Sequence, residues 1–329
     1  MELLGLDIVT VGLFVGFGLL IGIVFGFFGM GGSFLVTPAL LVVGYPAPVA
    51  VGSGLAFVFG TSIVGALRHR DHGQVSYTLA AVMISGMTFG IEVGTRVVFL
   101  LTDLGSVDVV ISGMYVGLLG AVGLFVLRDA RTDGTDVETG RVATRVQTIK
   151  LPPMVSLQGG ATVSVWVILV VGVGVGVLSG CLGVGGGFLL LPAMIYGFGV
   201  PTAVAAGTSI LQITVSGAFG TYVYAQSNAV DVSVVAALLL GSAFGARIGA
   251  GATRLVHEDD VKGYFAGMLL AGSVATASKQ VSAVYGVETL EIVSAVLIFG
   301  TAVLVSSAIA SASVDALRSN RDCGPSLIR

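Results

Sequence analysis

Charged residues, and the residues that build most catalytic and metal sites, are scarce in this sequence. Only 10% of its 329 residues are charged, whereas soluble domains carry about 25%. There are two cysteines, Cys181 and Cys323, and three histidines. Two cysteines are too few for a disulfide framework or a Cys-based zinc site, so we expect no metal centre and no cofactor. The formal net charge of −3 gives no reason to expect a nucleic-acid partner.

Apolar residues and glycine are abundant instead. Hydrophobic residues make up 55% of the chain, the mean hydropathy is +1.02, and there are 50 glycines. The run 6–28 alone is long enough to span a bilayer. No basic segment precedes this run, so we expect no cleaved signal peptide. The composition predicts an all-α polytopic protein of the cell membrane, with the lipid bilayer as its main surroundings.

Apolar windows predict eleven membrane segments. They lie near 6–28, 33–44, 48–67, 77–101, 107–127, 163–181, 187–199, 203–224, 232–254, 261–278 and 289–310. Two of them, 33–44 and 187–199, are short, and we interpret them as half-helices or short tilted spans. The polar stretch 128–162 separates two groups of segments. We expect it to be a cytoplasmic linker that is either solvated or folded into a small hairpin.

A glycine–proline motif occurs twice and reveals an internal repeat. The first copy runs Gly29-Met30-Gly31-Gly32-Ser33 and ends Pro38-Ala39; the second runs Gly183-Val184-Gly185-Gly186-Gly187 and ends Pro192-Ala193. Further glycines match at the same offset of 154 or 155 residues, and the last pairs match at 150. Each half holds five segments. Because five is odd, the second half enters the membrane from the opposite side, which makes an inverted repeat.

The repeat and the linker divide the chain into five parts. We expect a first transmembrane repeat at 1–127, the cytoplasmic linker at 128–162 and a second, inverted repeat at 163–280. An additional C-terminal transmembrane helix follows at 281–312, and a cytoplasmic tail at 313–329.

The basic residues predict the orientation. With eleven crossings, twelve of them fall on one side of the membrane and only Lys279 on the other. The twelve are Arg68, Arg70, Arg128, Arg131, Arg141, Arg145, Lys150, Arg254, Lys262, Arg318, Arg321 and Arg329. The positive-inside rule makes the crowded side the cytoplasm. The N-terminus is therefore expected outside and the C-terminus inside.

The glycines allow two interpretations. Gly86, Gly90 and Gly94 repeat every four residues, a spacing that lets membrane helices pack closely. The clusters at 29–32 and 183–187 are dense enough to break a helix, because each glycine costs about 1 kcal/mol relative to alanine. A helix that restarts after such a break presents free N–H groups that suit an anion. A tight structural turn is the alternative. Pro38 and Pro192 are expected to end or kink the short helices.

The paired motifs resemble the TauE/SafE sulfite exporter family, also called TSUP. The tracts Ala50-Val51-Gly52-Ser53 and Ala205-Ala206-Gly207-Thr208-Ser209 add to the resemblance, which covers about residues 10–310. The family implies a transporter of small anions such as sulfite or sulfonates. By position, the resemblance implies that substrate is bound by Gly29, Gly31, Gly32, Ser33, Ser53, Gly183, Gly185, Gly186, Gly187, Thr208, Ser209 and Gln212. The Gln212 amide would hydrogen-bond a sulfonate oxygen or simply bridge helices.

Two charged residues occupy equivalent repeat positions within the spans. Glu92 and Arg247 lie 155 residues apart. A charge at the middle of a membrane helix costs about 2.5–3.5 kcal/mol, so we expect both side chains to face the protein interior. They would form a structural ion pair, or Glu92 would carry a coupling proton while Arg247 attracts the anion. Arg96 lies one helical turn from Glu92, which favours a local pair instead.

Other classes of protein fit less well. An intramembrane enzyme needs a nucleophile with a base, or paired acids, within the membrane, and the sequence offers only Glu92 at depth. We therefore expect no enzyme. An anion channel is the nearer alternative, since the sequence does not show whether the gates on the two sides of the membrane can be open at the same time. Coupling to protons or to sodium is open, and so is the oligomeric state.

The predicted orientation can be tested directly. A reporter fused after Arg329 is expected to lie in the cytoplasm, because segments rich in basic residues stay on the cytoplasmic side of the membrane. A second reporter in the loop before Val107, with no basic neighbours, serves as the outside control. Exchange of the two signals would overturn the predicted topology.

Overall fold

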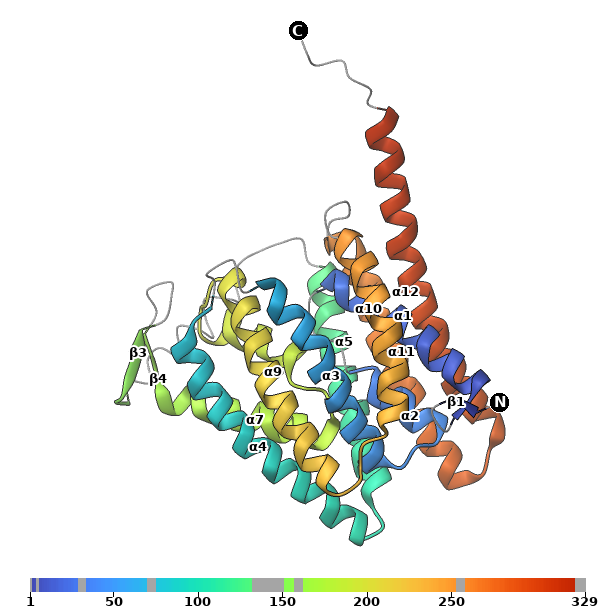
Figure 1. Ribbon diagram of the computed structural model, residues 1–329, viewed down its shortest axis with the longest axis horizontal. Helices are drawn as coiled ribbons and strands as arrows, with labels where there is room; N and C mark the ends of the chain where they lie inside the picture. Colours follow the sequence, from blue (N-terminus) through green and yellow to red (C-terminus); the bar gives the residue numbers. More distant parts are fainter. Residues whose placement is uncertain are drawn as a thin grey trace. The chain divides into compact units, whose positions relative to one another are not determined.

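The computed structural model describes residues 2–3, 6–28, 34–69, 75–131, 151–156, 162–252 and 258–322, and the chain is built from α-helices (Figure 1). In chain order they are α1 (Ile8–Phe28), α2 (Val36–Val43), α3 (Ala47–His69), α4 (Tyr77–Asp103), α5 (Val107–Arg131), α7 (Val165–Leu182), α8 (Gly187–Pro192), α9 (Thr202–Gln226), α10 (Val232–Ala252), α11 (Glu258–Tyr285) and α12 (Glu288–Asp322). A π-helical turn, η2 (Ala193–Gly197), continues α8.

Two short antiparallel hairpins accompany the helices. β1 (Glu2–Leu3) pairs with β2 (Leu6–Asp7), and β3 (Met154–Ser156) pairs with β4 (Thr162–Ser164). The second hairpin lies at the end of the expected linker and aligns Val155 with Val163. The small hairpin is therefore confirmed for this part; residues 132–150 and 157–161 lie outside the described residues.

Each of the eleven expected segments coincides with a helix, so the all-α membrane class is confirmed. Six helices are long and apolar enough to cross a membrane by length and composition: α1, α4, α5, α7, α10 and α12. Of the other five helices, α2 and α8 are short, as expected. α3, α9 and α11 do not meet this criterion over their described residues.

The helices form two compact units, each of which draws on both predicted halves. Unit 1 comprises Met1–Gly29, Tyr115–Asp133 and Ala236–Arg329; unit 2 comprises Met30–Met114 and Gly134–Val235. Unit 1 therefore holds α1, α11 and α12 with most of α10, and unit 2 holds α2–α4 together with α7–α9. These spatial units cut across the repeat boundaries expected at 127 and 163.

Unit 2 is organised around close contact between α4 and α7, which lie side by side in Figure 1. A Cβ added at Gly86 would lie 2.6 Å from the Leu169 carbonyl oxygen, and one at Gly94 would lie 2.5 Å from that of Val177. A Cβ at Gly180 of α7 would likewise lie 2.6 Å from the Ile91 carbonyl oxygen. The two backbones touch with no room for a side chain between them.

Unit 1 repeats this contact between α1 and α10. A Cβ added at Gly22 would lie 2.5 Å from the Ser242 carbonyl oxygen, and one at Gly245 would lie 2.8 Å from the Ile23 nitrogen. The glycines of α1 match those of α7 at an offset of 154, and the glycines of α10 match those of α4 at 155. The packing interpretation of these glycines is confirmed. Each pair takes one helix from each predicted half.

The C-terminal helix docks on the first helix of unit 1. The rings of Phe17 in α1 and Phe299 in α12 meet edge to face with centroids 4.8 Å apart. The Ser306 hydroxyl donates a hydrogen bond to the Leu20 carbonyl oxygen at 3.1 Å. The expected additional helix at 281–312 overlaps the end of α11 at 281–285 and continues as α12 from Glu288, and both helices belong to unit 1.

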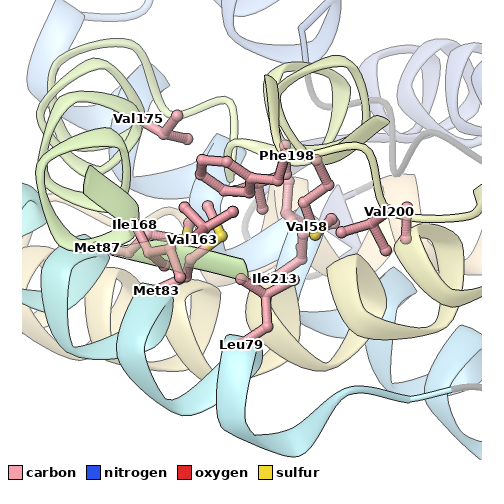
Figure 2. Packing of buried hydrophobic residues seen from close by; sticks show 13 residues of the cluster. Val58, Leu79, Met83, Met87, Val163, Ile168, Val175, Phe198, Val200 and Ile213 are labelled. Atoms are coloured by element: carbon pink, nitrogen blue, oxygen red, sulfur yellow. The ribbon is translucent and has the colours of Figure 1, made fainter. Parts of the chain in front are cut away.

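A buried apolar cluster fills unit 2 between α3, α4, α7, α8 and α9. Figure 2 shows the side chains of α4, with Leu79, Met83 and Met87, directed toward Val163, Ile168 and Phe198. The full cluster is Val58, Leu79, Met83, Met87, Val163, Ile168, Val175, Leu190, Met194, Phe198, Val200, Ala205 and Ile213. The hairpin strand β4 contributes Val163, and Val155 of β3, which lies in the expected linker, packs against the cluster.

Replacing Gly90 by alanine is expected to lower the thermal stability of the protein in detergent. Alanine favours helix by about 1 kcal/mol, but its Cβ would lie 2.8 Å from the Val177 nitrogen and 2.9 Å from Gly176 Cα. Neither backbone atom can move aside, so overpacking should leave a net loss of about 1–2 kcal/mol. Thermal unfolding measures this change.

Gly113→Ala is the matched control. Gly113 lies within α5, and no described atom lies within 4 Å of a Cβ added there. The helix propensity gain should then act alone and raise stability by up to about 1 kcal/mol. A rise in stability for both variants would show that α4 and α7 do not meet through Gly90.

Candidate functional site

The second glycine cluster breaks the chain between α7 and α8. Gly183 ends α7 in the left-handed conformation, with φ 71°, and its N–H donates to the Ser179 carbonyl oxygen at 2.7 Å. Gly185 and Gly186 also have positive φ, 65° and 78°, which only glycine adopts easily. The helix break predicted at this motif is confirmed. Its counterpart, Gly29, Gly31, Gly32 and Ser33, lies outside the described residues, between the end of α1 at Phe28 and Phe34.

α8 begins inside the protein with uncapped N–H groups. Its N-cap is Gly186, which has no side chain to bond them. The N–H groups of Leu189 and Leu190 bond the Gly186 carbonyl oxygen at 3.0 and 2.9 Å, whereas the N–H groups before them precede any intrahelical partner. Residues 183–188 are all buried. The break therefore offers backbone donors away from bulk water.

The two prolines behave differently. Pro192 closes α8, and the chain continues into the π-helical turn η2, as expected of a proline that ends or kinks a helix. The same expectation is wrong for Pro38. It lies in the first turn of α2, which runs on to Val43. A proline is tolerated there because the N–H groups of a first turn have no intrahelical acceptor.

The surroundings of the turn are apolar on one side and polar on the other. A Cβ at Gly186 would lie 2.8 Å from Val175 Cγ1 and 3.1 Å from Met87 Cε, within the apolar cluster. A Cβ at Gly183 would instead lie 2.9 Å from the Thr37 hydroxyl oxygen and 2.5 Å from the Val51 carbonyl oxygen. The turn is thus enclosed by α2, α3, α4 and α7.

The predicted hydroxyl residues Ser53 and Thr208 each hold the start of another helix. The Asp231 N–H, at the start of α10, donates to Ser53 Oγ at 3.0 Å. The Ser76 N–H, at the start of α4, donates to Thr208 Oγ1 at 3.0 Å. Sequence reasoning missed this role, although both donors directly precede expected helices. The oxygens satisfy N–H groups that a helix start leaves unpaired, and each hydroxyl still has its own proton to donate.

Asp231 also caps α10 with its side chain. Its Oδ1 accepts the N–H groups of Ser233 at 3.0 Å and Val234 at 3.2 Å. Burial and, secondarily, the negative charge of Asp231 raise the pKa of the Tyr45 hydroxyl in the loop before α3. Tyr45 therefore stays protonated and neutral across the physiological pH range.

Gln212 is the most unusual polar residue of the second half. It lies in α9, is 0% exposed, and neither atom of its amide has a hydrogen-bond partner among the described residues. Leaving such groups unpaired costs about 1–3 kcal/mol each, so a buried orphan points to a ligand or a bound water. Ser209, also in the predicted site, donates instead to its own helix at Ala206 O, at 2.8 Å.

The predicted charged pair is not built as expected. Glu92 bonds Arg96 of the same helix, with Arg96 Nε and Nη2 at 2.9 and 2.8 Å from Oε1. Arg96 is 79% exposed and Glu92 35%. Arg247 is also exposed, so the expectation that it faces the interior is wrong. The local pair with Arg96 is confirmed; the roles of Glu92 and Arg247 in coupling stay predictions.

Two further buried hydroxyls belong to the surroundings of the turn. Thr37 in α2 and Ser179 in α7 have no hydrogen-bond partner among the described residues. Neither residue could be singled out from the sequence, because serine and threonine in membrane helices usually bond their own backbone. Cys181 is buried and free, with Sγ 3.5 Å from the Gly94 carbonyl oxygen, which confirms it as a small core residue.

Several apolar helices, with a buried helix break and orphaned polar groups, are the features of a multi-pass membrane transporter. Residues 14–276 match the profile of the family described as sulfite exporter TauE/SafE. The chain belongs to this family.

Curated relatives are described as probable membrane transporter proteins. The chain is 30% identical over 237 residues to a probable membrane transporter protein of Xylella fastidiosa strain 9a5c, covering 71% of this chain and 82% of that one. It is 28% identical over 252 residues to the probable membrane transporter protein YunE of Bacillus subtilis, covering 74% and 89%. A probable membrane transporter protein of Methanocaldococcus jannaschii is 27% identical over 219 residues, covering 64% and 72%. No solved structure matches the chain.

Thr208→Val is expected to destabilise the protein by about 1–3 kcal/mol, because it leaves the buried Ser76 N–H without an acceptor. Thr214→Val is the control, since Thr214 only donates to Ile210 O of its own helix, at 2.8 Å. Thermal unfolding in detergent compares the two. Equal, small losses would mean that the Thr208–Ser76 bond contributes nothing to holding α4 on α9.

Proposed function

We propose that this transporter carries small sulfur oxyanions or sulfonates, with sulfite as the first candidate, by alternating access between two inverted halves. The observation that carries the proposal is the buried helix break at Gly183–Gly187, with uncapped N–H groups at the start of α8. Backbone donors bind an anion without a charged side chain, so the anion is held but can also leave.

The substrate would be bound by neutral donors. We assign this role to the N–H groups of Gly185, Gly186 and Gly187 and to the amide of Gln212, whose unpaired state fits a group that waits for a ligand. The hydroxyl protons of Ser53 and Thr208 would add donors. The first cluster, Gly29 to Ser33, would act in the same way in the other half. A sulfonate presents three acceptor oxygens, which suits several converging donors.

The inverted arrangement is supported by bonds that recur between the halves. The Ser76 N–H bonds Thr208, and the Asp231 N–H bonds Ser53. Ser76 and Asp231 are equivalent in the repeat, 155 residues apart, and so are Ser53 and Thr208. The glycine contacts of α4 with α7 and of α10 with α1 exchange in the same way. Two equivalent halves with opposite orientation provide two equivalent states, one open to each side.

The orientation with the N-terminus outside and the C-terminus in the cytoplasm is part of the proposal. So is coupling to a cation gradient, by a proton or by sodium. Uncoupled passage is the alternative: an anion channel would have the same helices and the same donors. Saturable, gradient-dependent flux distinguishes the carrier from a channel.

The proposal is tested by reconstituting the purified chain in liposomes and measuring uptake of sulfite, small sulfonates and carboxylates. We expect saturable uptake of sulfite or a sulfonate. Gln212→Leu should reduce the uptake rate about tenfold or more, because one well-placed hydrogen bond is worth about 1.4 kcal/mol. Thr214→Val, two residues further along α9, should leave the uptake rate unchanged.

The outcomes separate the alternatives. Unitary currents in a planar bilayer would replace the carrier with a channel. If no anion of the panel enters the liposomes while the protein remains folded, the anion-transport proposal fails.

A further inference from the structure

The C-terminal end of α7 lies in the interior of unit 2. Its last residues, Ser179 to Leu182, are buried, and the last turn has no basic side chain. The final carbonyl groups of any helix lack intrahelical partners and form the negative end of its dipole. Here the Gly183 N–H bonds the Ser179 carbonyl oxygen, and the Tyr224 hydroxyl bonds that of Gly180 at 2.6 Å.

Three oxygens from three elements meet at this end. A Cβ placed on Gly183 would lie 2.9 Å from Thr37 Oγ1 and 2.5 Å from the Val51 carbonyl oxygen. A Cβ placed on Gly54 would contact Thr37 Oγ1 and lie 2.9 Å from the Gly183 carbonyl oxygen. The Thr37 hydroxyl oxygen therefore lies near the carbonyl oxygens of Val51 and Gly183, at a place where Gly54 and Gly183 have no side chains.

The two hydroxyls near this end form no hydrogen bond with their own helix. Thr37 Oγ1 and Ser179 Oγ are buried and have no hydrogen-bond partner among the described residues. Thr61, Thr88 and Thr214, by contrast, bond a carbonyl oxygen of their own helix one turn earlier. Other hydroxyls of unit 2 thus bond their own helix, whereas these two do not, although a buried hydroxyl without a partner costs about 1–3 kcal/mol.

Neutral oxygens at a negative helix end suit a monovalent cation. Divalent Ca²⁺ and Mg²⁺ are held by carboxylates, and none of the oxygens here is a carboxylate. Na⁺ binds carbonyl and hydroxyl oxygens, and the unwound ends of helices in transporters provide such oxygens.

We propose that Na⁺ binds at the end of α7, held by the Thr37 hydroxyl and the Gly183 carbonyl, with Val51 O and Ser179 Oγ as further ligands. The same break then presents carbonyl oxygens to a cation and, after three glycines, N–H groups to an anion. This inference rests on the proposed function for its purpose, since it names the coupling ion of that transport.

Thermal unfolding of the full-length protein in detergent tests the site with Na⁺ alone. NaCl replaces choline chloride at constant ionic strength, and KCl forms a third arm. A cation that binds only the folded state raises the unfolding temperature in a saturable way. We expect this rise with NaCl, and a half-saturating concentration about tenfold higher or more in Thr37→Val, which loses one ligand.

Matched variants keep the result interpretable. Thr37→Ser retains the hydroxyl and should retain the response, and Ser179→Ala should weaken it. Thr88→Val, whose hydroxyl bonds Ile84 O at 2.7 Å, should respond like the parent. If Thr37→Val fails to fold, the comparison of Ser179→Ala with Thr37→Ser decides. No response of the parent to NaCl beyond that to choline chloride, or an equal response to KCl, overturns the assignment of Na⁺.

Transport assays separate this inference from the function on which it rests. Sulfite uptake that is equally fast with and without a Na⁺ gradient would overturn the sodium site and leave anion transport intact. A specific thermal response to Na⁺ in a protein that moves no anion would support the site and overturn the anion proposal.

Discussion

Backbone polar groups inside a membrane must find partners within the protein, and this constraint shapes both the helices of this transporter and the place where one breaks. Within α4 and α7 the N–H and C=O groups pair along their own helix, so the two backbones can touch through Gly86, Gly90 and Gly94. At Gly183 the helical pairing stops, and the next helix starts at Gly187 in the protein interior. Glycine thus allows close packing at one place and breaks the helix at the other.

Equivalent contacts occur twice in this structure. The pair α4–α7 and the pair α1–α10 use equivalent glycines, and each pair joins one helix from each half of the sequence. The hydroxyls of Ser53 and Thr208 likewise hold helix starts that are equivalent in the repeat. Equivalent contacts therefore occur twice, and each time they join one helix from each half of the sequence.

The helix break gathers two kinds of polar group at one point. The end of α7 supplies carbonyl oxygens, and the start of α8 supplies N–H groups. Thr37 adds a buried hydroxyl that has no hydrogen-bond partner among the described residues. Since an unpaired buried group is costly, a conformation that fills these positions with ligands would be stabilised relative to the empty one. In the proposed function, this difference would couple binding to conformational change.

The sequence alone determined the membrane class, the positions of the helices and the break at Gly183, because hydropathy and glycine density are local properties. It also predicted close packing at Gly90 and its equivalents. Only the tertiary structure decided which helices those glycines join and that the spatial units cut across the repeat. It placed Pro38 within a first turn, exposed Arg247 and left Thr37 without a hydrogen-bond partner among the described residues. These depend on which residues from distant segments meet, and no local pattern records that.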